Sequence, residues 1–399
     1  MSASLANRSL RAFPTGPMQL THLAVVLATA IAYALTAQVS GTVASPIMAD
    51  FAMPFGFYVG VSIASIAVGV LGSLAAGLAD RVGRVNLVAG GLLLDALLTV
   101  FGTPLAGSQN AFLVFTVLTG VIQGAGGVAL PALVRDFAPQ VHRATAMAMW
   151  SLGPVVGALV VHALASATET AHPGWRYQYR LCGSIALAVA VAAAFLLREL
   201  SPALRNQVVV VSREAGLAEL RAAAGHVTDR PSWRSVLRVD VVTSAVAISV
   251  YLVFYYTQVG FFVVFLMTTF SYSGASANGL VTWYWGVSAA ALVATGAMSD
   301  RLGVRKPFMV AGGVVSAAGS AVLAVCTTRP DTSHATFVAV MVLAAVGNGL
   351  TFGPWMASHT ELVERHNAAA AASGLAVWSA INKIVVVSVL IAFAFVVTA

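Results

Sequence analysis

Charged residues are scarce in this sequence: Asp, Glu, Lys and Arg make up only 9% of the 399 residues, whereas 59% are hydrophobic. A soluble protein of this size carries about a quarter charged residues. A surface exposed to water cannot be built from so few charges, so lipid must cover most of it. The scarcity excludes an ordinary soluble protein and predicts an all-α polytopic membrane protein.

Other features are rare or missing. The two cysteines, Cys182 and Cys326, both fall inside apolar segments and are expected to pack there, so neither a disulfide framework nor a metal site is indicated. The sequence has no G-x-x-x-x-G-K-[ST] loop for ATP and no His and Glu cluster with metal-ligand spacing. We therefore expect no cofactor and no catalytic residues.

Basic residues outnumber acidic ones, 21 to 14, and their placement is informative. Most lie in short loops between apolar runs, which indicates membrane topology and argues against nucleic acid as a partner. With the N-terminus in the cytoplasm, only Arg176, Arg180 and Arg329 lie outside, and Lys383 lies within a helix. The asymmetry predicts a multi-pass protein of the cell (inner or plasma) membrane with a cytoplasmic N-terminus.

Apolar segments long enough to span a bilayer recur along the chain, since a spanning helix needs about 20 apolar residues. We predict eleven: 20–43, 57–79, 86–106, 111–134, 144–166, 178–197, 239–267, 275–298, 307–328, 335–358 and 370–398. The predicted domains are a cytoplasmic arm over 1–19, a six-helix bundle over 20–198, a polar cytoplasmic linker over 199–238 and a second bundle over 239–399. The arm lacks an apolar core and is not expected to be a cleaved signal.

The two halves repeat. Asp80-Arg81-Val82-Gly83 recurs 220 residues later as Asp300-Arg301-Leu302-Gly303. Gly124, Gly126 and Pro131 recur 223 residues later as Gly347, Gly349 and Pro354. Parallel repeats of this kind occur in transporters. The same offset places a twelfth span after Ala399, so we expect either a truncated second bundle or an eleven-helix variant.

The loop Gly77-Leu78-Ala79-Asp80-Arg81-Val82-Gly83-Arg84 resembles the signature loop after helix two of the major facilitator superfamily, and Gly296 to Lys306 resembles its second copy. The resemblance runs from about residue 20 to the end of the chain and is nearest to drug or metabolite–proton antiporter-like members. It implies a two-bundle fold that works by alternating access. The alternative for the loop arginines is that they only fix the topology.

The resemblance also implies a cytoplasmic gate. Asp80 would face the positive end of a helix, and Arg84 would pair with Asp136. In helix five, Gly153-Pro154-Val155-Val156-Gly157 resembles the family's antiporter motif, with a simple packing kink as the alternative. The gating residues expected are Asp80, Arg81, Gly83, Arg84, Asp136, Gly153, Pro154, Gly157, Asp300, Arg301, Gly303 and Arg305.

Two departures from the antiporter pattern weaken a drug–proton reading. Gly120 stands where such proteins carry an arginine, and Ala37 stands where many carry an aspartate. Asp95 is the proton-coupling candidate that remains, although it can also be a buried hydrogen-bonded group. Lys383 lies on a helix that borders the cavity in this family, so it predicts an anionic solute.

Polar and aromatic side chains recur at helical spacing in the helices that would line the cavity, where they suit solute binding. Hydrogen bonding between helices is the alternative for them. The predicted substrate-binding residues are Tyr33, Gln123, Tyr251, Tyr255, Gln258, Asn348, Trp378, Asn382 and Lys383.

The preferred function is secondary transport of a small organic solute, with a proton as the coupling ion, in efflux or uptake. The chain is expected to be a monomer in the lipid bilayer and not an enzyme. A transporter-like sensor or scaffold without flux is the alternative, and an intramembrane enzyme is less favoured.

Overall fold

Long helices make up nearly all of the computed structural model. It describes residues 9–10, 12–74, 83–137, 143–201, 204, 237–329, 331–366 and 371–398. Small and apolar residues dominate the helical segments and leave few polar groups besides the backbone, which an α-helix satisfies internally. The fold class predicted from composition is confirmed.

The first part of the chain carries α1 (Pro17–Thr42), a short α2 (Ala44–Asp50) and α3 (Phe55–Leu74). Next come α5 (Arg84–Leu97), a π-turn η1 (Leu98–Gly102) and a 3₁₀ turn η2 (Thr103–Leu105). The helices α6 (Gln109–Phe137), α7 (Arg143–Thr168) and α8 (Trp175–Leu196) follow. Each predicted span before residue 199 thus contains a helix, and α2 is an addition that the sequence did not predict.

The second part carries α11 (Val239–Tyr251), α12 (Val253–Thr269), α13 (Gly274–Leu302), α14 (Lys306–Thr327), α15 (His334–His366) and α16 (Ala371–Thr398). The sequence predicted one helix over 239–267, and the structure corrects this to two helices that meet at Leu252. Leu252 has φ −73° and ψ −5°. No proline or glycine lies there, and the buried Leu252 packs with Ile248 and Trp355, so packing sets the break.

Among the described residues, eight helices are long and apolar enough to cross a membrane. Three shorter apolar helices, Leu152–Thr168, Val239–Tyr251 and Val377–Ala392, add to them. Large apolar side chains are also exposed on the helices, such as Phe195 at 69% and Val310 at 67%. Water disfavours such a surface and lipid accepts it, so the chain is a multi-pass membrane protein. The exact number of spans stays a prediction.

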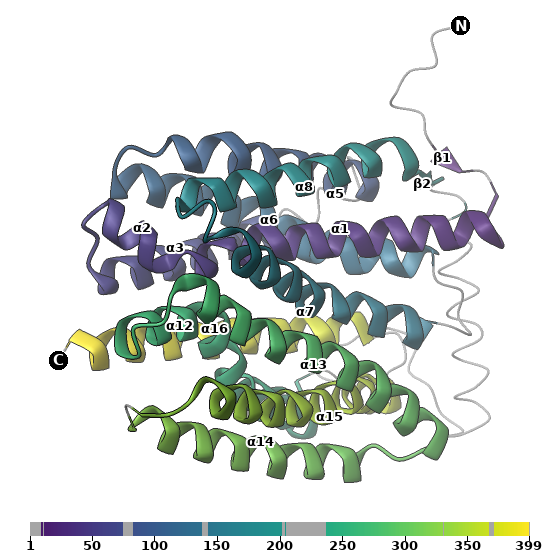
Figure 1. Cartoon of the computed structure of the whole chain (residues 1–399). Coiled ribbons are helices and arrows are strands. Elements are labelled where there is room, and N and C mark those ends of the chain that lie inside the picture. The colour runs from purple at the N-terminus through teal and green to yellow at the C-terminus, as the bar shows by residue number, and fades with distance from the viewer. Residues whose placement is uncertain are drawn as a thin grey trace, which may run out of the picture. The chain divides into compact units, whose positions relative to one another are not determined.

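Contacts divide the chain into two compact units. Unit 1 comprises 1–37, 60–157 and 179–225, and unit 2 comprises 38–59, 158–178 and 226–399. In unit 1, apolar residues of α1, α5, α6 and α8 form a core that includes Val26, Val88, Leu133 and Ala190. In unit 2, α15 packs against both α13 and α14 (Figure 1). The predicted boundaries at 19, 198 and 238 stay predictions.

The start of the chain is tied to the region after α8. Strand β1 (Ser9–Leu10) pairs in parallel with β2 (Glu199–Leu200), and the two lie together in Figure 1. Leu10 also packs against the unit 1 core. The arm predicted over 1–19 therefore makes an ordered contact at its middle.

Candidate functional site

Asp95 on α5 is a fully buried carboxylate inside unit 1. The Thr36 hydroxyl on α1 donates to Asp95 Oδ2 at 2.5 Å. The Gln123 amide on α6 donates to both carboxylate oxygens at 3.3 Å. Three helices thus converge on one carboxylate, which compensates for the loss of water around it.

The partners of Asp95 suit both of its protonation states. A hydroxyl can donate to an ionised carboxylate and can accept from a protonated one, whereas an amide N–H only donates. Thr36 can therefore reverse its role when Asp95 takes up a proton, while Gln123 remains a donor. Gln123 was predicted to bind solute, and its described contacts are to Asp95 and Thr36.

Tyr33, another predicted solute residue, lies within the same three-helix contact. Its hydroxyl donates to the Val88 carbonyl at 3.0 Å. Its ring lies on Gly126, where an added Cβ would come 2.7 Å from Tyr33 Cζ. The interhelical alternative describes these contacts, and solute binding by Tyr33 stays a prediction.

Aromatic and polar side chains form a second group in unit 2, which we call the aromatic cluster: Tyr251, Tyr255, Tyr256, Trp285, Phe352, Trp355, Trp378 and Asn382. The Tyr255 ring meets the rings of Tyr256 and Trp285 edge-on, with centroids 5.1 and 5.0 Å away. Asn382 Nδ2 donates to the Tyr256 hydroxyl at 2.5 Å. The Trp355 and Trp378 rings lie 5.3 Å apart. The cluster joins α11, α12, α13, α15 and α16.

Buried polar atoms in the aromatic cluster make no hydrogen bond within the described residues. They are Trp285 Nε1, Trp378 Nε1 and Asn382 Oδ1. Burying a polar atom without a partner is unfavourable, so such atoms are suited to bind a guest molecule or water. Trp285 was not among the predicted solute residues, because a tryptophan in such a segment can equally lie at the membrane interface.

The other predicted solute residues are less completely described. Lys383 is half-buried on α16 beside Asn382, and Asn348 is buried on α15. Tyr251 shares a hydrogen bond of 2.6 Å with Ser316. Gln258 lies in α12, and its side chain is outside the described residues.

The first copy of the repeated loop is held by an unpredicted residue. Backbone N–H groups of Arg84 and Val85 donate to the Glu199 carboxylate at 3.0 and 2.9 Å. Gly83 has φ 98°, a conformation that favours glycine. Glu199 thus caps the N-terminus of α5, where a negative charge is favourable. Asp80 and Arg81 and the side chain of Asp136 lie outside the described residues.

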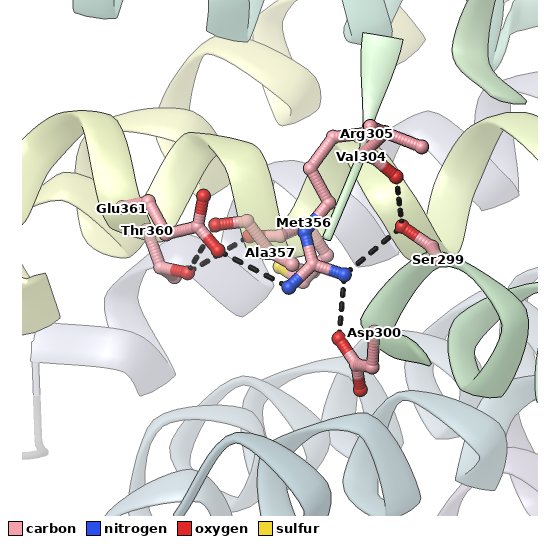
Figure 2. A network of polar contacts seen from close by, with 8 residues as sticks. All are labelled: Ser299, Asp300, Val304, Arg305, Met356, Ala357, Thr360 and Glu361. Carbon is pink, nitrogen blue, oxygen red and sulfur yellow. Dashed lines mark hydrogen bonds and ion pairs between the residues drawn. The ribbon is translucent and has the colours of Figure 1, made fainter. Parts of the chain in front are cut away.

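The second copy forms an ion-pair network (Figure 2). Arg305 Nη1 donates to Asp300 Oδ1 at 2.5 Å and to Ser299 Oγ at 2.9 Å, and its Nη2 bonds Glu361 Oε1 at 3.2 Å. Gly303 ends α13 in the left-handed region with φ 66°. The pairing expected between Arg84 and Asp136 thus has a counterpart in unit 2 between Arg305 and Glu361. Arg301 is exposed on the last turn of α13.

Comparison with known proteins identifies the family. The family model of the Major Facilitator Superfamily matches residues 25–394, nearly the whole chain. The chain belongs to the Major Facilitator Superfamily. The resemblance to this superfamily is thereby confirmed, and the repeat of the two halves stays a prediction.

Solved structures of transporters share the fold. A bacterial homolog of the human lysosomal transporter Spinster, inward-facing and unoccupied, matches with a TM-score of 0.71 and 19% identity, over 94% of this chain and 82% of that one. A D-xylose–proton symporter matches with a TM-score of 0.66 and 16% identity, over 92% and 90%. These neighbours share the fold of this chain, and the family match agrees with the expectation of a transporter rather than an enzyme.

Among curated proteins, the efflux pump radE of Floropilus chiversii is 29% identical over 225 residues, which is 54% of this chain. The match spans only 40% of the length of that relative.

The superfamily motif in helix five is a packing site between α7 and α1. A Cβ added at Gly157 would lie 2.5 Å from the Ala34 Cβ, and one at Gly153 would lie 2.8 Å from the Ala30 Cβ. Pro154 lies inside α7 between these glycines. The glycines allow the close approach that was predicted for them, and a gating role for the motif stays a prediction.

The Gly174-Trp175-Arg176 sequence at the start of α8 binds a carboxylate. The Trp175 indole and the Arg176 guanidinium donate to Asp50 Oδ2 at 3.0 and 2.6 Å. These two donors hold the pKa of the Asp50 carboxyl below its usual range. The motif thus ties the start of α8 to the end of α2.

Proposed function

We propose that this protein is a secondary transporter that moves a small organic solute across the membrane by alternating access, coupled to protons. Asp95 is the observation that carries the proposal. Ionisable groups inside a membrane are costly and mark proton or substrate pathways. Asp95 is fully buried, and its partners Thr36 and Gln123 can accommodate a carboxyl in either protonation state.

The aromatic cluster is our proposed solute site. Rings of tyrosine and tryptophan offer apolar area, while Trp285 Nε1 and Trp378 Nε1 offer donors and Asn382 Oδ1 an acceptor. This combination suits a planar solute with hydrogen-bonding groups. Lys383, next to Asn382, adds a cation, so we propose that the solute also carries a carboxylate or another negative group.

The protein acts, in this proposal, as a monomer in the cell (inner or plasma) membrane with its N-terminus in the cytoplasm. The arginine distribution supports that orientation. The relative named an efflux pump supports export over uptake. The loops at Gly83 and Arg305 are proposed to hold the cytoplasmic side closed during part of the cycle.

A solute sensor without flux is the second candidate, and liposomes separate the two. A thermal-shift screen of aromatic carboxylates and their uncharged amide analogues would first supply a bound probe. Liposomes that contain the purified protein and carry a pH gradient should then accumulate that probe against its concentration gradient. Tight binding without flux would favour the sensor, and the absence of binding throughout the panel would remove the support for the aromatic cluster as the solute site.

A further inference from the structure

A polar contact joins the ends of α1, α7 and α13 inside unit 2, on the side predicted to face outward. Asn278 on α13 lies at its centre and is fully buried. Its Nδ2 donates to the carbonyls of Thr42 and Gly274, both at 3.0 Å. Its Oδ1 lies 2.8 Å from His162 Nδ1 on α7.

The hydrogen-bond chemistry of Asn278 fixes the arrangement. Because Nδ2 faces two carbonyl acceptors, the amide oxygen is the atom that faces His162. His162 Nδ1 must therefore be the donor, and the ring is the Nδ1–H tautomer. His162 Nε2 is buried and makes no hydrogen bond within the described part of the chain. The hydrogen bond therefore runs from His162 to Asn278, and both side chains are buried.

Residues at helical spacing extend the contact along α7. His162, Ser166 and Glu169 are separated by four and three positions, which places them on one face. The Ser166 hydroxyl donates to the Ala275 carbonyl at 2.9 Å. The Glu169 carboxylate lies directly on Gly274, at the first turn of α13, where an added Cβ would collide with it. Asn278 Nδ2 lies 3.5 Å from Glu169 Oε2.

Glu169 is the titratable group at the rim of this contact. It is the first residue after α7 and is partly buried. Burial raises the pKa of its carboxyl above the usual range, and the hydrogen bond from Asn278 lowers it by a smaller amount. The ionised form therefore gains more from exposure to water than the protonated form does.

Few other charges face Glu169. The first turns of α13, from Gly274 to Leu280, carry no titratable residue, and the Thr42 carbonyl at the end of α1 is bonded to Asn278. On its own segment, His162 precedes it and His172 follows, the latter stacked on Tyr177 with centroids 4.0 Å apart. Beyond these, Arg176 is paired with Asp50 at 2.6 Å.

We propose that Glu169, together with Asn278 and His162, is a second proton-binding site, separate from Asp95, which controls whether the ends of α7 and α13 stay together. Protonated Glu169 remains against Gly274, and the helix ends stay closed. Loss of the proton leaves a charge in a partly buried position, and separation of the two ends hydrates it. The closed state therefore binds the proton more tightly, so it is favoured at low pH and is lost as the pH rises through the raised pKa.

The test measures the distance between the two helix ends without solute or gradient, so it does not depend on transport. Spin labels at Ala167 and Ser276, both exposed, would be introduced after replacement of Cys182 and Cys326 by alanine. Pulsed electron–electron double resonance would measure the distance between the labels in nanodiscs at about pH 5 and about pH 8, on either side of the expected titration. The ratio of short to long distances should fall with rising pH, by about tenfold for each unit of pKa difference between the two states.

Variants decide the assignment. Glu169→Gln should keep the short distance at both pH values, because its amide has no proton to lose in this range. Asp331→Asn, which removes an exposed carboxyl from another loop, should respond like the wild type. A normal pH response in Glu169→Gln would overturn the proposal. Loss of the response in Asp95→Asn would assign the proton to Asp95 instead.

Discussion

At the scale of the residue, sequence reasoning could find the buried charge but not its partners. Asp95 stood out because a carboxylate in an apolar segment is rare. Thr36 and Gln123 lie 59 and 28 positions away from it. Nothing in the sequence distinguishes them from other threonines and glutamines, so their contact with Asp95 could not be predicted. Glu199 is missed for the same reason, since its role depends on the loop it caps 115 positions earlier.

Lys383 gives a prediction at this scale. Lys383→Gln keeps the length and polarity of the side chain but removes its charge, so it should weaken binding of an aromatic carboxylate by more than about tenfold. Binding of the matching uncharged amide should change little. The measurement is isothermal titration of purified protein, with the exposed Lys306→Gln as the control variant. Equal losses for acid and amide would show that Lys383 supports the fold and not an anion.

At the scale of the element, hydrophobicity predicted the positions of the helices well, but it predicted breaks within them poorly. The span expected at 307–328 is α14, Lys306–Thr327, because apolar length decides where a helix can cross a bilayer. The break at Leu252 escapes such reasoning, because no proline or glycine marks it. The short helix α2 follows a break at Val43, and Pro46 in its first turn has no N–H to continue the hydrogen bonding of α1.

The repeat in sequence also conceals a difference in packing. Gly124 and Gly347 occupy equivalent positions, yet Gly124 lies against Gly69 of α3, while Gly347 lies against Ser316 of α14. Both glycines permit close approach of helices, as expected of small residues in membrane bundles. The pattern predicts the kind of contact but not the partner helix.

The ion-pair network at the end of α13 gives a prediction for elements. Arg305 side-chain exposure is 22% and that of Glu361 is 46%, so each pair contributes about 1 kcal/mol or less to stability. Glu361→Gln should therefore leave the melting temperature nearly unchanged but slow solute flux, because it releases the α13–α14 loop from α15. Flux in liposomes and thermal unfolding measure the two effects. The double variant Arg305→Glu with Glu361→Arg should recover part of the flux. A large drop in the melting temperature of Glu361→Gln would contradict a gating role, because unfolding would then account for the lost flux.

At the scale of the whole molecule, composition and charge asymmetry predicted a multi-pass protein, and the family match over residues 25–394 agrees. The pattern could not predict how contacts group the helices. The outer ends of α1 and α7, including Thr42 and His162, belong to the same compact unit as α13. Such grouping comes from side-chain contacts between distant segments, which a hydropathy pattern does not contain.

Orientation is testable at this scale. Of the 21 basic residues, only Arg176, Arg180 and Arg329 are expected outside, and Lys383 within a helix. A single cysteine at Ser108 should react with an impermeant thiol reagent in intact cells, whereas a cysteine at Ser235 in the linker should react only after permeabilisation. The reverse labelling pattern would invert the topology and place the Glu169 contact on the cytoplasmic side.

The central claim is that solute movement and proton movement are one process that passes through Asp95. Liposomes that contain the protein and a trapped pH-sensitive dye measure it most directly. Addition of the aromatic carboxylate found by thermal shift should change the internal pH with the wild type and with Asp331→Asn. Asp95→Asn should bind the same probe yet move no protons. Solute flux in the wild type without any pH change, or an unaltered pH change in Asp95→Asn, would contradict the claim.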